Sequence, residues 1–186
     1  MTGKQRKEWF DWIKALGIAA VIAIIIRMFL FSPVIVDGPS MLPTLQNGDY
    51  LIVNKLSYSM GEPERFDIVV FQATETKKYI KRVIGLPGEH VAYRDDKLYV
   101  DEKPIEEPFL KERLDQLGDN QTYTFDFALE DLPGGNQTIP EGYVLVLGDN
   151  RNNSTDSRRL GLISKENLIG ETQFIIWPPK RIGPVD

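Results

Sequence analysis

The sequence predicts a mainly β protein with a single transmembrane helix near its N-terminus. Two patterns indicate this architecture. An apolar run covers residues 13–31, and beyond Pro33 the chain breaks into short β-rich runs bounded by Gly, Pro, Asn or Asp. The roughly 150 residues after the apolar run are enough for one hydrophobic core but not for two full domains. We therefore expect a membrane span over residues 13–31 and one β-rich domain over residues 32–186.

The apolar run has the length of a membrane span. From Ile13 to Phe31 it is about 28 Å long as a helix, at about 1.5 Å per residue, and the hydrocarbon core of a bilayer is about 30 Å thick. Lys14 and Arg27 lie close to its two ends, where long basic side chains reach the interface. The segment between them is apolar on nearly every face, which favours a membrane span over a core helix.

Basic residues before the span predict its orientation. Four lie before it or at its start: Lys4, Arg6, Lys7 and Lys14. Beyond Arg27 the next basic residue is Lys55. By the positive-inside rule, residues 1–12 are a cytoplasmic tail and residues 32–186 are extracytoplasmic in a single-pass protein of the cell membrane. A cleavable signal peptide is the alternative, although residues 29–33 offer no small-x-small cleavage site.

Composition removes several classes of function. The net charge of -5 gives no electrostatic footprint for nucleic acid. Because the chain has no cysteine, it has no disulfide framework, no thiolate zinc site and no cysteine nucleophile. Any histidine-dependent catalysis would have to use His90, since it is the one histidine in the sequence. The sequence implies no metal or organic cofactor and predicts no particular oligomeric state.

Seven β-rich runs define the expected extracytoplasmic domain. They are Tyr50–Val53, Asp67–Phe71, Tyr79–Ile84, Val91–Arg94, Lys97–Val100, Tyr143–Leu147 and Thr172–Ile176. Hairpin turns are predicted at residues 94–97 and 101–104. Residues 108–140 are polar and rich in turn signals, so we interpret them as an insertion with weak structure.

The first candidate for chemistry is Ser40, which follows a Gly38-Pro39 bend and precedes another bend at Pro43. Such bends expose a hydroxyl. Taken alone, the segment fits a turn serine bonded to the local backbone better than it fits a nucleophile.

The second candidate is Lys81. On a strand, Lys81 shares its face with Tyr79 and Val83, and these neighbours would remove water from its amine. A lysine base needs such burial, because the usual pKa of about 10.4 leaves only about one amine in a thousand neutral near pH 7. The alternative is a charged edge strand formed with Lys77, Lys78 and Arg82.

The third candidate is the polar loop over residues 147–158. It holds Asp149, Asp156, Arg151 and Arg158, which can pair with one another and with Arg82. Most loops of this kind are simply solvated. The density of charged and hydrogen-bonding groups here favours a network that supports a site.

Together the segments resemble the bacterial type I signal peptidases, which are membrane-anchored serine proteases. Five motifs carry the resemblance in order along the chain: Ser40-Met41 with Pro43-Thr44; Gly48-Asp49; Asp67-Ile68-Val69; Lys81 to Glu89; and Gly148 to Arg151 with Ser154, Asp156, Ser157 and Arg158. Phe66 stands where the family often has glycine. The resemblance implies an antiparallel β-sheet domain of partial-barrel form.

The resemblance also implies roles for these residues. Ser40 would be the nucleophile and Lys81 the general base of a Ser/Lys dyad. Ser154 would orient the lysine amine, Asp156 and Arg158 would hold the loop, and Arg82 and Asp149 would support the site. The backbone N–H of Ser40 would stabilise the oxyanion. Some family members have a serine two positions before the nucleophile whose hydroxyl assists, but this chain has Gly38 there.

The implied substrates are signal peptides of exported preproteins, cleaved after a small-x-small site. An extended peptide would add as a strand beside residues 33–38 and 77–82. By resemblance, the candidate pocket residues are Val36, Met41, Leu45, Tyr79 and Ile80, each of which also fits plain core packing. The implied partners are thus signal peptides and the lipid bilayer.

Three alternatives remain open at this point. A serine-histidine hydrolase would place His90 beside Ser40. A self-cleaving repressor uses a Ser/Lys pair on a similar β scaffold, but a membrane span argues against it. A catalytically idle, membrane-tethered binding module is the third alternative, although such a module would have no reason to keep Ser40, Lys81 and Ser154.

Overall fold

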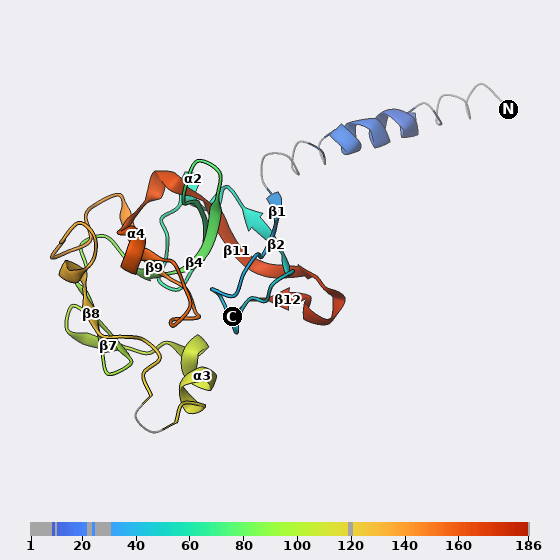
Figure 1. Cartoon of the computed structure of the whole chain (residues 1–186). Coiled ribbons are helices and arrows are strands. Elements are labelled where there is room, and N and C mark those ends of the chain that lie inside the picture. Colours follow the sequence, from blue (N-terminus) through green and yellow to red (C-terminus); the bar gives the residue numbers. More distant parts are fainter. Residues whose placement is uncertain (1–8, 10, 22–23, 25–30, 119–120, 186) are drawn as a thin grey trace.

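The computed structural model describes residues 9, 11–21, 24, 31–118 and 121–185 (Figure 1). Residues 11–21 are helical, and their apolar side chains are exposed, including Trp12 and Leu16. Parts of the expected span, residues 22–23 and 25–30, lie outside the described residues. Within the described part of the chain, no helix has the length and apolar character needed to cross a membrane. Phe31, taken above as the last residue of the span, is instead the first residue of a strand.

Two antiparallel sheets form the body of the described chain. The larger sheet has eight strands among the described residues, in the order β1-β2-β11-β3-β4-β9-β10, with β12 paired to β11. Its strands are β1 (Phe31–Ile35), β2 (Tyr50–Asn54), β3 (Ile68–Gln72), β4 (Lys78–Gly85), β9 (Tyr143–Leu147), β10 (Ile163–Ser164), β11 (Leu168–Trp177) and β12 (Gly183–Pro184). Every pairing in this sheet is antiparallel, so the prediction of a mainly β fold built from antiparallel strands is confirmed.

The smaller sheet has four strands among the described residues, in the order β7-β6-β5-β8. These strands are β5 (Val91–Arg94), β6 (Lys97–Val100), β7 (Lys103–Ile105) and β8 (Phe127–Ala128). The short helices and 3-10 turns that connect the strands of the two sheets are α2 (Ser57–Met60), η1 (Pro108–Leu110), α3 (Lys111–Asp115), η2 (Leu129–Asp131), α4 (Ser157–Leu160), η3 (Lys165–Asn167) and η4 (Pro179–Arg181).

All seven predicted strands are present. Strands β5, β6 and β9 have the predicted bounds, and the bounds of the other four differ by a few residues at most. The largest change is in β11, which begins at Leu168 and ends at Trp177 because it pairs with β2, β3 and β12. Both predicted hairpin turns are also present. Asp95 and Asp96 have positive φ between β5 and β6, and Asp101 and Glu102 do so between β6 and β7, as tight turns matching the strand twist require.

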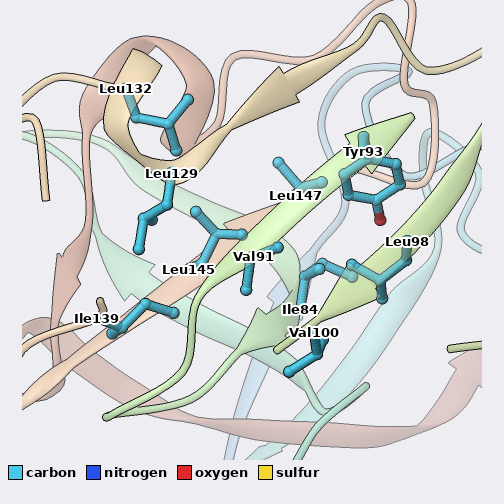
Figure 2. Close-up of a cluster of buried hydrophobic side chains, with 10 residues drawn as sticks. All are labelled: Ile84, Val91, Tyr93, Leu98, Val100, Leu129, Leu132, Ile139, Leu145 and Leu147. Atoms are coloured by element: carbon cyan, nitrogen blue, oxygen red, sulfur yellow. The ribbon is translucent and has the colours of Figure 1, made fainter. Parts of the chain in front are cut away.

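The largest hydrophobic cluster joins the two sheets (Figure 2). Strands β4 and β9 of the larger sheet contribute Ile84, Leu145 and Leu147. Strands β5 and β6 of the smaller sheet contribute side chains such as Val91 and Leu98. Burial of this apolar surface fixes the smaller sheet against the end of β4 that follows Lys81.

Residues 108–140 are better packed than the sequence suggests. Their elements are short, as expected of weak structure, but several of their side chains are buried: Leu110, Tyr123, Leu129, Leu132 and Ile139. Asp96 also accepts hydrogen bonds from the backbone N–H groups of Tyr123 and Thr124. The segment therefore contributes to the core beside the smaller sheet. Its elements are short, as the expectation of weak structure implies, but the burial of its apolar side chains was not predicted.

Candidate active site

Ser40 lies in a series of turns between β1 and β2. Gly38 has φ +100°, a conformation that favours glycine because it has no Cβ. After Pro39, the N–H of Leu42 donates to Pro39 O at 3.1 Å, and the N–H of Leu45 donates to Met41 O at 2.9 Å. This turn, stabilised by local hydrogen bonds, presents the Ser40 hydroxyl to a cleft.

Lys81 comes from β4, between β3 and β9 of the larger sheet. Its Nζ donates hydrogen bonds to Ser40 Oγ and to Ile80 O, both at 2.8 Å. The Nζ atom also lies 5.2 Å from the centre of the Tyr79 ring. Only 3% of the Lys81 surface is exposed. The structure thus brings together a serine hydroxyl and an amine that are 41 residues apart.

Burial lowers the pKa of Lys81 from 10.5 to about 8, although the negative charges of Asp156 and Asp149 act to raise it. Desolvation dominates because it penalises the ammonium form directly. With a pKa of about 8, roughly one Lys81 in ten is neutral at pH 7, compared with fewer than one in a thousand for an ordinary lysine. Lys81 is therefore able to accept a proton from Ser40 near neutral pH.

Asp149 connects three parts of the site. Its carboxylate accepts hydrogen bonds from Arg82 Nε at 3.0 Å and Nη2 at 2.8 Å, and from Thr44 Oγ1 at 2.5 Å. Arg82 follows Lys81 on β4, while Thr44 belongs to the series of turns that contains Ser40. Since Asp149 and Arg82 are both buried, this network holds the Ser40 turn, β4 and the polar loop in a fixed relation.

Asp156 and Arg158 brace the polar loop, as the pattern of charges predicts. Asp156 accepts from Arg158 Nε at 2.9 Å and Nη2 at 2.8 Å, and from the N–H of Gly148 at 3.0 Å. Burial acts to raise the pKa of Asp156, but the bonds and charge of Arg158 outweigh it and hold this pKa below the usual value. Asp156 is therefore ionised at neutral pH.

Ser154 lies near Ser40, but it forms no hydrogen bond with Lys81. Its buried Oγ has no hydrogen-bond partner among the described residues. It is close to Gly148, where a side chain would collide with both Ser154 Oγ and the carbonyl oxygen of Ser40. The role of Ser154 in orienting the amine therefore stays a prediction.

Ser40 and Lys81 open into a cleft of about 330 Å³ between the chain before Ser40 and the start of β4. Four of the five candidate pocket residues line it: Val36, Met41, Tyr79 and Ile80. Leu45 is fully buried and packs behind Val36 and Met41 instead of lining the cleft. Asn153 and Thr155 line the cleft from the polar loop.

Two residues that hold the turns around Ser40 were not identified from the sequence. Asn150 donates through its side chain to Pro39 O at 3.1 Å and through its backbone N–H to Ser40 O at 3.0 Å. Arg181 donates to both carboxylate oxygens of Asp49 and, at 3.0 Å, to Thr44 O. Asn150 belongs to the motif from Gly148 to Arg151, whereas Arg181 gives no local signal because Asp49 is 132 residues away.

His90 lies apart from this arrangement. Its backbone N–H donates to Asp101, and its Nε2 atom lies 3.0 Å from Glu130 Oε2. These contacts belong to the smaller sheet and the segment that follows it. The geometry therefore does not support a serine-histidine hydrolase built on Ser40.

An antiparallel β fold that places a serine hydroxyl in an open cleft beside a buried amine is the arrangement of a serine peptidase. A family model described as signal peptidase, peptidase S26, matches residues 9–177. The chain belongs to this family, and the resemblance stated from its motifs is confirmed.

Individual relatives agree with this assignment. Signal peptidase I of Bacillus caldolyticus is 44% identical over 180 residues, which are 97% of this chain and 95% of the relative. Signal peptidase IB of Staphylococcus aureus (strain Mu50) is 42% identical over 177 residues, with 93% and 92% covered. The crystal structure of a signal peptidase I from Enterococcus faecalis V583 superposes with a TM-score of 0.56 at 42% identity, covering 59% of this chain and 96% of that one.

Proposed function

We propose that this protein is a membrane-anchored endopeptidase that removes N-terminal signal peptides from exported preproteins after a small-x-small site. Ser40 is the nucleophile and Lys81 the general base. The observation that carries the proposal is the 2.8 Å contact between Lys81 Nζ and Ser40 Oγ in a buried setting. The relatives named signal peptidase I supply the substrate class.

The first half of the reaction forms an acyl-enzyme. Ser40 Oγ attacks the carbonyl carbon before the scissile bond while its proton passes to the neutral amine of Lys81. The negative charge that develops on the carbonyl oxygen is stabilised by the backbone N–H of Ser40. When the intermediate collapses, Lys81 returns the proton to the leaving amine, and the mature protein departs.

The second half releases the signal peptide. A water molecule gives a proton to Lys81 and attacks the ester carbon, and Lys81 then protonates Ser40 Oγ as the ester breaks. Lys81 thus begins and ends the cycle neutral. Asp149, Arg82, Asp156 and Arg158 support this cycle by holding the polar loop and β4 in place.

The cleft suits an extended peptide with small side chains. It runs along residues 34–41 on one side and residues 78–81 on the other, and both segments have extended backbone where they belong to β1 and β4. A peptide bound in this way exposes alternate side chains to the same wall. Val36, Met41, Tyr79 and Ile80 make that wall largely apolar, and Leu45 supports it from behind.

An anchor in the cell membrane would place the enzyme where its substrates are. The proposed span covers residues 13–31, with residues 1–12 in the cytoplasm and residues 32–186 outside it, as the distribution of basic residues indicates. A signal peptide is itself apolar and lies in the same bilayer. Holding enzyme and substrate at one depth reduces the entropic cost of their encounter.

The test is cleavage of an A-x-A peptide by the full chain in detergent. We expect Ser40→Ala to abolish cleavage and to leave peptide binding within about threefold, because the cleft walls are unchanged. Ser164→Ala, which removes a serine hydroxyl from β10 outside the cleft, is the matched control and should keep wild-type activity. Cleavage by Ser40→Ala would disprove the dyad. Binding without cleavage by the wild type would favour a tethered binding module.

A further inference from the structure

Asn150 holds the peptide groups on both sides of the nucleophile. Its side-chain Nδ2 donates to Pro39 O at 3.1 Å, and its backbone N–H donates to Ser40 O at 3.0 Å. The side-chain amide must present its NH2 group to Pro39, because a carbonyl oxygen only accepts hydrogen bonds. One residue of the polar loop therefore contacts the carbonyl before Ser40 and the carbonyl of Ser40 itself.

The contact with Pro39 O determines where the N–H of Ser40 points. Pro39 O and the Ser40 N–H belong to the same peptide group, which is planar and trans, so the two bonds point in opposite directions. Fixing the oxygen fixes the direction of the N–H. A hydrogen bond accepted by the oxygen also polarises the group and makes its N–H a stronger donor.

We propose that Asn150 is a positioning residue for the oxyanion site, which orients and polarises the Ser40 N–H through Pro39 O. This inference rests on the proposed function and adds the origin of its transition-state stabilisation. Asn150 itself does not touch the substrate in this scheme.

The neighbouring residues make this N–H especially important. Gly38 has no side chain to donate, and its own N–H donates to Asn47 Oδ1 at 2.9 Å. Pro39 has no N–H. Among residues 38–40, Ser40 is left as the backbone donor for the oxyanion, so the orientation of its peptide group carries more of the stabilisation than it would beside a second donor.

Asn150 is well placed for this role because its neighbours in the chain are fixed. Asp149 is bound by Arg82, and its carbonyl oxygen accepts from Tyr123 OH at 2.7 Å. Arg151 is buried and donates to Gly148 O at 3.1 Å. These contacts fix the backbone of Asn150 at a distance from which its side chain bonds Pro39 O before the substrate arrives. Such preorganisation is the condition for electrostatic stabilisation at low cost.

The decisive variant is Asn150→Ala in the full chain, since it removes the bond to Pro39 O and keeps the backbone bond to Ser40 O. We expect kcat on the A-x-A peptide to fall by about 10- to 100-fold, somewhat less than the loss of a whole oxyanion donor. KM should stay within about twofold, and the pH dependence should not move because no charge changes. Asn152→Ala is the control, because this exposed residue of the same loop lines a different pocket and not the cleft that holds Ser40.

A boronic acid peptide separates positioning from structural damage. Ser40 Oγ adds to boron, the hydroxyl proton passes to Lys81, and the resulting tetrahedral anion imitates the transition state. In Asn150→Ala, affinity for this compound should fall by the same factor as kcat/KM, while affinity for an uncleavable peptide should stay unchanged. Equal losses for both compounds, or an unchanged kcat, would overturn the proposal.

Asn150→Asp tests the same point should the alanine variant fold poorly. It keeps the size and the backbone N–H but presents a carboxylate, which cannot donate to Pro39 O, so kcat should fall at least as far as in Asn150→Ala. Wild-type kcat in this folded variant would overturn the proposal. These outcomes differ from failure of the proposed function, in which the wild type would not cleave or Ser40→Ala would still do so.

Discussion

Two buried cations, Lys81 beside the polar loop and Arg151 within it, have surroundings that affect them in opposite ways. Lys81, in the larger sheet, is bonded to a hydroxyl and a carbonyl oxygen but to no carboxylate of the residues that the structure describes. Arg151, which reaches toward the smaller sheet, is 2% exposed and donates to Glu107, Tyr93 OH, Thr124 Oγ1 and Gly148 O. Both cations are shielded from water, but of the two only Arg151 forms an ion pair within the described part of the chain, with Glu107.

The pKa values of the two side chains are shifted in opposite directions. Burial lowers the pKa of Lys81 to about 8. Burial also acts to lower the pKa of Arg151, but Tyr93 and Glu107 outweigh it, so that this pKa lies above its usual value. A fully paired cation braces the fold, whereas an incompletely paired one is held ready to lose its proton. The fold thus keeps an incompletely paired amine at Lys81, beside the Ser40 hydroxyl, at a cost in stability.

The largest expected effect is that of Lys81→Met. Because the variant has no general base, its activity on the A-x-A peptide should fall by about 10²- to 10⁴-fold. Stability should rise, because the folded state no longer has to bury an ammonium group whose pKa is lowered from 10.5 to about 8, a shift worth about 3 kcal/mol. Denaturant unfolding of both proteins at pH 7 measures this gain.

The pH dependence of the stability difference between wild type and Lys81→Met tests whether the lowered pKa of Lys81 is its cause. Between pH 8 and 10.5 the unfolded wild type binds more protons at Lys81 than the folded wild type, so its stability rises with pH there. The advantage of the variant should therefore be complete below pH 8 and vanish by about pH 10.5. Wild-type kcat/KM should rise with pH toward a plateau with an apparent pKa near 8. A variant that is less stable than the wild type at pH 7 would contradict the comparison.

Arg151→Met should have the opposite effect on stability. It leaves the buried Glu107 carboxylate without its cation, and breaking a buried pair from one side costs about 3–5 kcal/mol. Thermal unfolding should show the loss. The double variant Arg151→Met with Glu107→Gln should recover a large part of it, since the uncompensated charge is then gone. Equal stability of the single and double variants would show that the pair is not coupled.

The smallest expected effect is that of His90→Ala. Its contact with Glu130 is largely exposed, so the stability change should stay within about 0.5 kcal/mol. Peptide cleavage should be unchanged because His90 contacts neither Ser40 nor Lys81 among its described hydrogen bonds. A loss of activity comparable with that of Lys81→Met would revive histidine-dependent catalysis.

Local patterns predicted much of the fold. The β-rich runs between turn residues gave strands β2 to β6, β9 and β11, and the Asp95-Asp96 turn formed as expected. The packing of residues 108–140 was not predictable, because their polar composition conceals widely spaced apolar residues such as Tyr123 and Leu129 that fill the core. Leu45 was predicted to line the cleft for a similar reason. The sequence does not distinguish an apolar residue that lines a site from one that packs behind it.

The sequence by itself determined the family, the candidate dyad and the order of the strands along the chain, since these depend on residue types and short spacings. Tertiary structure decided which polar groups meet. The hydrogen bond from Asn150 to Pro39 joins residues that are 111 positions apart in the sequence. The hydrogen bond from Arg181 to Asp49 joins residues that are 132 positions apart. Such contacts arise from the antiparallel pairing of distant strands, and so does the burial that lowers the pKa of Lys81, because removal of water is a property of the assembled sheet and not of any local pattern.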